Sequence, residues 1–211
     1  PAVPKRPAAR EPVAPPQVAQ QLGLMPLASS GITAFLVAHP TFDGRGVLVG
    51  VLDSGVDPGV LGLQATTTGA LKILDLRDFS GEGDVALVPV SADGQGRIAL
   101  PGGLTVGGIA AVRAAATSDE WFGGVLQELP FGDAPAADFN GNGTNRDRYG
   151  IVVVRGVSGW LALVDTNGDG TLADETARAD FLVRRETFTF ASRLAPRGKG
   201  PITAALNLGD E

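Results

Sequence analysis

The pattern of apolar and polar positions divides the chain into three stretches of different character. Residues 1–22 are rich in proline and alanine and show no amphipathic period, which predicts an extended arm. Residues 23–78 carry longer apolar runs, whereas residues 79–211 alternate short apolar runs with glycine-rich turns. The pattern therefore predicts an α/β segment that is followed by a β-rich region.

Two element types are expected in the middle stretch. A helix should occupy the second half of residues 21–40, with Ser29 or Ser30 as its cap. Residues 47–53, "VLVGVLD", are apolar without alternation, which is typical of a strand buried on both faces in a parallel sheet. Residues 73–78, "ILDLRD", are a second strand candidate. The fold class predicted for this part is α/β.

The third stretch contains further strand candidates, separated by short polar turns. The clearest are a hairpin of "YGIVVVRG" and "GWLALVD" across "GVS", and the short pieces "VALVPV", "GRIALPG" and "LTVGGI". One helix is expected in "LADETARADFLVRRE", and "PITAALNLGDE" begins like a strand. No internal repeat is visible in this pattern.

Composition narrows the range of functions. The net charge of −6 argues against nucleic acid or an anionic membrane surface as a partner, and no apolar run reaches membrane-spanning length. Cysteine is absent, which excludes thiol nucleophiles and zinc–thiolate sites. His39 is the single histidine, and its place after an apolar helical stretch indicates a helix-end or surface residue. The beginning "PAVPKRPAAR" is interpreted as a processed or trimmed end.

Asp53 is the main candidate for chemistry because it ends the buried run of residues 47–53. An acid at the carboxyl end of a parallel strand lies at the edge of the sheet where α/β folds place their ligand sites. A helix cap or a turn former are the structural alternatives for such a residue. Position alone leaves these interpretations open.

The residues around Asp53 favour function. "VGVLDSGVD" resembles the aspartate motif of subtilisin-like serine peptidases, and "FDGRGVLVGVLDSGVDPG" is similar to their tripeptidyl-peptidase II branch. The resemblance implies the N-terminal part of a parallel-sheet catalytic core at residues 23–78. It also implies a β-rich insertion at residues 79–211, which returns toward the core. Asp53 would be the carboxylate that orients a catalytic histidine, and Asp57 would be a structural or substrate-side acid.

The other triad members are missing from this sequence. No histidine follows Asp53, and the His-Gly-Thr-His and Gly-Thr-Ser-Met-Ala motifs of the family are absent. We therefore expect the remaining portion of the peptidase to supply His, Asn and Ser, as a separate chain after cleavage. A peptide or protein would be the substrate, and no cofactor would be needed for the chemistry. The substrate pockets of the family lie mostly outside this sequence.

Location and assembly follow less directly. The branch contains large cytosolic oligomers, so the resemblance implies a cytoplasmic homo-oligomer. The proline-rich N-terminal stretch favours an exported protein, either secreted or periplasmic. Both alternatives stay open.

Two other functions compete for the same residues. "VLDSG" also fits the Asp-Ser/Thr-Gly motif of aspartic peptidases, but their mechanism needs two such aspartates, so a homodimer would be required. The non-enzymatic alternative is a calcium-stabilised β-rich structural or interaction module without peptidase activity.

A calcium site is predicted in "DTNGDGTLADE", where oxygen-bearing residues alternate and a glycine permits a sharp turn. The acid expected at the twelfth position of an EF-hand loop falls one place early, so any site would be a looser turn. "DFNGNGTNRD" is a weaker version of the same pattern, interpreted as a polar turn. The predicted ligands are Asp165, Asn167, Asp169, Thr171 and Asp174.

Overall fold

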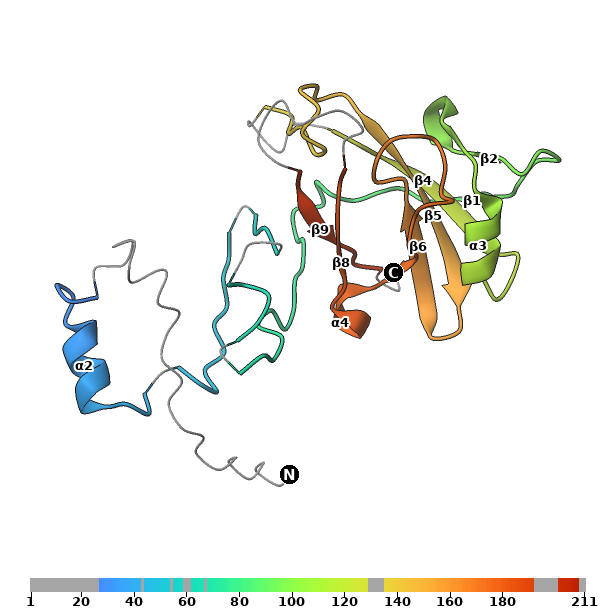
Figure 1. The fold of residues 1–211 in the computed structure, drawn as a ribbon. Helices are drawn as coiled ribbons and strands as arrows, with labels where there is room; N and C mark the ends of the chain where they lie inside the picture. The colour runs from blue at the N-terminus through green and yellow to red at the C-terminus, as the bar shows by residue number, and fades with distance from the viewer. Residues whose placement is uncertain are drawn as a thin grey trace. The chain divides into compact units, whose positions relative to one another are not determined.

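The computed structural model describes residues 27–42, 44–53, 55–58, 62–66, 68–128, 135–191 and 201–208, and Figure 1 shows their helices and strands. The predicted arm at residues 1–22 and the motif residue Ser54 lie outside the described residues. The chain separates into two compact units. One comprises Pro1–Val56 with Ala65–Ala70, and the other comprises Asp57–Gln64 with Leu71–Glu211.

The first unit contains the predicted helix, α2 (Ile32–Ala38). Its N-cap is Gly31, with φ 78°, and no side chain caps it, so the prediction of a serine cap is wrong. A glycine suits this position because it adopts the left-handed conformation without steric cost. His39 ends the helix and donates its backbone N–H to the Phe35 carbonyl at 2.8 Å, as predicted for a helix-end histidine.

The run at residues 47–53 does not form the predicted buried strand. Its described residues have no ladder partner and are exposed, with Leu52 98% accessible and Leu48 78% accessible. The predicted strand at residues 73–78 is likewise irregular. A strand needs at least one neighbouring strand to form a ladder, and the described chain supplies none to either segment.

The second unit is built on an antiparallel sheet whose strands lie in the order β1-β4-β5-β6-β7. The parallel-sheet core of the fold prediction is therefore not confirmed, because every described ladder of two or more residue pairs is antiparallel. The prediction that residues 79–211 are rich in β-strands is confirmed. The strands of the main sheet are β1 (Val88–Val90), β4 (Trp121–Gln127), β5 (Arg148–Gly156), β6 (Gly159–Val164) and β7 (Arg178–Ala179).

Apolar side chains cover both faces of β5, the strand at the centre of this sheet. Val152 and Val154 point into one cluster, together with Trp121 and Leu163. Ile151 and Val153 point into the other cluster, whose aromatic members are Phe139, Tyr149 and Phe190. Side chains alternate along a strand, so an unbroken apolar run is the pattern that two buried faces require.

Short elements complete the unit, and several correct the sequence prediction. The hairpin across "GVS" is confirmed by the pairing of Gly156 with Gly159. The helix expected in "LADETARADFLVRRE" shrinks to the four residues of α4, and the sequence analysis missed α3 and β4. No described helix has the length and apolar character that crossing a membrane requires. The remaining elements are β2 (Ile98–Ala99), η1 (Pro101–Gly103), β3 (Thr105–Val106), α3 (Ile109–Ala115), α4 (Phe181–Arg184), β8 (Thr187–Thr189) and β9 (Thr203–Ala205).

Candidate functional site

Asp53 lies at the end of the exposed apolar run. Both Asp53 and Asp57 are exposed in the structure, and Leu52 beside them is almost fully accessible. Gly55 has open space around the position that a Cβ would take, so no neighbour within the described residues imposes glycine there. Asp53 therefore follows an exposed apolar segment that no sheet of the described residues flanks.

His39 belongs to an aromatic group in the first unit. Its ring lies 4.8 Å from the Phe35 ring and 5.3 Å from the Phe42 ring, measured between centroids. Phe35 and Phe42 are themselves 48% and 64% accessible. His39 therefore ends α2 and packs its ring against two phenylalanines, which agrees with the structural role predicted for it.

Asp165, Asn167, Asp169 and Thr171, four of the five predicted calcium ligands, lie in one tight turn. The two carboxylate oxygens of Asp165 accept the backbone N–H groups of Asp169 and Gly170, each at 2.9 Å. The Asn167 side-chain oxygen also accepts from Asp169 N at 2.9 Å, and Asp169 accepts from Thr171 N at 2.8 Å. The loop is closed by its own backbone amides, and the Asn167 amide reaches Asp174 at 3.0 Å.

Burial makes this loop electrostatically costly. Asp165 is 1% accessible, and burial raises its pKa although the amides of Gly170 and Asp169 act in the opposite direction. Burial also raises the pKa of Glu175, which accepts both the backbone N–H and the hydroxyl of Thr166. Among the described residues, neither carboxylate is paired with a lysine or arginine. A cation beside them would relieve this cost.

A second loop repeats the first almost atom for atom. Asp138 accepts the N–H groups of Asn142 and Gly143, the residues four and five positions later, at 3.0 and 2.7 Å. Asn140 accepts from Asn142 N at 3.0 Å, and Asn142 accepts from Thr144 N at 2.7 Å. The common pattern is Asp-x-Asn-Gly-x-Gly-Thr, with "DFNGNGT" before β5 and "DTNGDGT" after β6. The two turns are thus a short internal repeat, which the pattern of apolar positions alone does not reveal.

Positive φ angles explain why glycines recur in both loops. Gly141 and Gly143 have φ of 72° and 90°, and Gly168 and Gly170 have φ of 66° and 79°. A side chain at any of these positions would be strained. The two loops differ chemically at their fifth position, where Asp169 carries a charge and Asn142 does not.

Neither loop shows a formed metal site. No group of three or more Asp, Glu, His or Cys side chains in the described part of the chain is placed to hold a metal ion. The oxygen donors of the loop at residues 165–174 are of the type that Ca²⁺ binds. The carboxylate side chains among them do not converge on one point in the described structure. Calcium at Asp165, Asn167, Asp169, Thr171 and Asp174 therefore stays a prediction.

Glu128, at the end of β4, is a buried acid that the sequence analysis missed. Its side chain accepts Phe139 N at 2.7 Å, Asp147 N at 2.8 Å and the Tyr149 hydroxyl at 2.9 Å. Burial and this carboxylate together raise the pKa of Tyr149 far above its usual range. Glu128 thus links both ends of the 138–147 loop to the sheet. In the sequence, the sign of this role is an acid placed directly after the largely apolar run "WFGGVLQ".

Comparison with known proteins gives the family context. The chain is 51% identical over 76 residues to tripeptidyl-peptidase 2 of Oryza sativa subsp. japonica, which is 36% of this chain and 6% of that protein. It is 53% identical over 51 residues to tripeptidyl-peptidase 2 of Caenorhabditis elegans, covering 24% of this chain and 4% of the relative. It is 29% identical over 174 residues to pyrolysin of Pyrococcus furiosus, covering 74% of this chain and 12% of that protein.

The matches are partial with respect to the relatives, since the chain spans only a small fraction of the length of the curated proteins it matches. No protein-family profile matches the chain, and no solved structure matches it. The recurrence of one peptidase name in plants and a nematode, with pyrolysin over a longer stretch, agrees with the motif around Asp53. Over the matched stretches, the chain thus resembles subtilisin-like serine peptidases of the tripeptidyl-peptidase II-like branch.

Proposed function

We propose that this chain is the N-terminal portion of a subtilisin-like serine peptidase that hydrolyses peptide bonds. Asp53 orients a histidine that a segment or chain outside this sequence supplies, together with the oxyanion asparagine and the serine nucleophile. The relatives support a peptidase, and the motif "VLDSGVD" supports the role of Asp53. The substrate is a peptide or protein.

The proposed chemistry explains why an acid is needed at this position. A serine hydroxyl becomes a nucleophile when a histidine takes its proton, and the imidazole must be held as the correct tautomer. A carboxylate that accepts the imidazole Nδ1–H does this and stabilises the cation that forms. Asp53 can perform this one step, and the chain has no histidine after it to perform the next.

The observation that carries the proposal is the exposed apolar run before Asp53. Val47, Leu48, Val49, Val51 and Leu52 are between 67% and 98% accessible. Exposed apolar stretches of this kind mark surfaces that another segment covers. We propose that the remaining portion of the peptidase adds strands beside residues 47–53 and so completes a parallel sheet with Asp53 at its edge.

The test is Asp53→Asn in the complete peptidase. Asparagine keeps the shape of the side chain but favours the wrong histidine tautomer, so kcat should fall by about 10⁴-fold while folding is retained. Labelling by a fluorophosphonate probe should fall in parallel. Asp119→Asn, at an exposed acid outside the motif, is the matched control, and it should label at close to the wild-type rate. Undiminished labelling of Asp53→Asn would rule out the proposed role.

The same labelling separates the competing functions. A calcium-stabilised module without peptidase activity would not react with the probe at any residue. A homodimeric aspartic peptidase would resist the probe and respond to an acid-peptidase inhibitor. Native mass spectrometry would show the second chain, and a folded monomer of 211 residues as the sole active species would exclude it.

We also propose that Ca²⁺ stabilises the loop from Asp165 to Asp174. The support is the set of hard oxygen donors, together with the buried Asp165 and the half-buried Glu175, whose pKa values burial raises. The ion would contribute stability and would take no part in the peptidase chemistry.

A further inference from the structure

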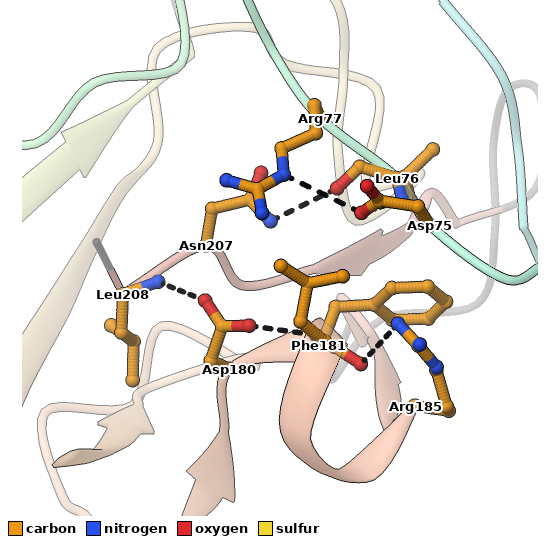
Figure 2. Close-up of polar contacts among 9 residues, drawn as sticks. Asp75, Leu76, Arg77, Asp180, Phe181, Arg185, Asn207 and Leu208 are labelled. Carbon is orange, nitrogen blue, oxygen red and sulfur yellow. Dashed lines mark hydrogen bonds and ion pairs between the residues drawn. The ribbon is translucent and has the colours of Figure 1, made fainter. Parts of the chain in front are cut away.

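The two ends of the β-rich insertion lie side by side. Figure 2 shows residues 75–77, where the chain enters this region, next to residues 207 and 208, where it leaves. The Asn207 side-chain amide donates to the Leu76 carbonyl at 2.9 Å, across a separation of 131 residues in sequence. The incoming segment is further shaped by an ion pair between Arg77 and Asp75 at 3.4 Å.

Asp180 holds the outgoing segment from the other side. One of its carboxylate oxygens accepts Leu182 N at 2.7 Å and so caps α4. The other oxygen accepts Leu208 N, also at 2.7 Å (Figure 2). The backbone adds a third link, because Phe181 N donates to the Leu206 carbonyl at 2.7 Å. The Asp180 side chain thus fixes the start of α4 and the outgoing segment at Leu208 together.

The side chains of the outgoing segment alternate in role. Leu206 and Leu208 pack against the aromatic cluster that contains Tyr149 and Phe190. Asn207, between them, is exposed and bonds to Leu76. Alternate residues of an extended chain face opposite ways, so the two leucines anchor the segment while Asn207 ties it to the incoming segment at Leu76.

We infer that Asp180 and Asn207 are positioning residues of the peptidase, which we call the clasp together with their partners Leu76 and Leu208. The clasp returns the chain to a fixed point beside the segment that follows the Asp53 motif. This inference rests on the proposed function, in which the histidine comes from outside this sequence. A fixed return point beside Leu76 limits the paths by which the histidine-bearing portion joins this chain, and orientation of reacting groups controls the rate.

The experiment uses the complete peptidase and the rate of fluorophosphonate labelling. Asn207→Asp has the same shape but cannot donate to Leu76, and it should slow labelling by about 10- to 100-fold. Asn207→Gln keeps the amide donor and should recover most of the rate. Asp180→Asn still caps α4 but turns an amide toward Leu208 N–H, so it should also slow labelling. Asn145→Asp is the matched control, since it removes a similar exposed amide–carbonyl bond, to Ala136 at 3.4 Å.

The results separate the clasp from the proposed function. We expect Asn207→Asp to label slowly and Asn207→Gln to recover most of the rate. We also expect Asn207→Asp to have the same thermal midpoint as Asn145→Asp. Wild-type labelling by Asn207→Asp, beside loss of labelling in Asp53→Asn, would overturn the clasp and leave the proposed function standing. Equal slowing in Asn207→Asp and Asn207→Gln would overturn the donor role of Asn207. Retained labelling in Asp53→Asn would instead overturn the proposed function.

Discussion

Two stretches of this chain have nearly the same apolar character and very different surroundings. Residues 47–53, "VLVGVLD", are exposed and belong to no sheet of the described residues, whereas "GIVVVRG" in β5 is buried on both faces. Val154 in β5 is 0% accessible, and Leu52 is 98% accessible. Both sequences fit a strand equally well by composition, so the difference comes from what the rest of the chain places beside each one.

The neighbours of β5 make the difference concrete. Val152 pairs with Gly123 of β4 on one side and with Leu163 of β6 on the other. Gly123 leaves room for Leu100 and Val90, whose side chains would lie 2.5 and 2.8 Å from a Cβ there. Residues 47–53 have no such flanking strands within the described chain. An apolar run indicates that a segment is buried in the functional protein. The strands or side chains that bury it need not lie close to it in sequence.

The largest effect is expected from placing a charge in each stretch. Val154→Asp should cost more than about 4 kcal/mol of unfolding free energy, because it buries an unpaired carboxylate. Leu52→Asp should change the stability of the 211-residue chain by less than about 0.5 kcal/mol, because the side chain is already in water. Urea unfolding followed by far-UV circular dichroism measures both.

The same pair in the complete peptidase sharpens the comparison. There Leu52→Asp should become as damaging as Val154→Asp and should abolish activity. If Leu52→Asp stays harmless in the complete peptidase, residues 47–53 are not covered by added strands and the comparison fails.

Hydrogen exchange of the two stretches tests the comparison without mutation. Amides of residues 48–52 should exchange near the unfolded rate in the 211-residue chain, whereas those of residues 151–154 should be protected. In the complete peptidase the first set should gain at least about 100-fold protection, which is about 2.7 kcal/mol of local opening free energy. Mass spectrometry of peptic fragments reads both stretches in one sample, so each serves as the control for the other.

These contrasts also show what the sequence could reveal. The α2 helix, the β5–β6 hairpin and the β-rich texture of the second unit follow from local periodicity and turn residues, and they were predicted. The strand β4 was missed because its two central glycines, Gly123 and Gly124, interrupt the apolar run, although they are what allow Leu100 and Val85 to approach. The clasp could not be predicted, because the bond from Asn207 to Leu76 depends on the path of the 131 residues that separate them in sequence.

The candidate site divides in the same way. The Asp53 motif is a local signal, and the relatives agree with it. Alternating oxygen-bearing residues mark the turn at residues 165–171 in the sequence, while its twin at residues 138–144 has one acid fewer and gives a weaker signal. Their shared backbone hydrogen bonds show that the turn depends on the first Asp, the Asn and the two glycines. The turn therefore forms with either a charged or a neutral residue at its fifth position, Asp169 or Asn142.

The smallest expected effect concerns that charge and compares the twin loops directly. Asp169→Asn gives the second loop the sequence pattern of the first, and Asn142→Asp does the reverse, so each variant is the control of the other. If calcium binds the second loop, EGTA should lower the wild-type melting temperature by a few degrees, at about 2–4 °C per kcal/mol for a chain of this size. Asp169→Asn should remove this shift because a neutral ligand holds Ca²⁺ more weakly, and Asn142→Asp should enlarge it. Differential scanning fluorimetry with Ca²⁺, Mg²⁺ and EGTA measures all three proteins. A melting temperature indifferent to EGTA in each of them would mean that hydrogen bonds alone close both loops, and that the acidic loop differs from its neutral twin in charge without differing in function.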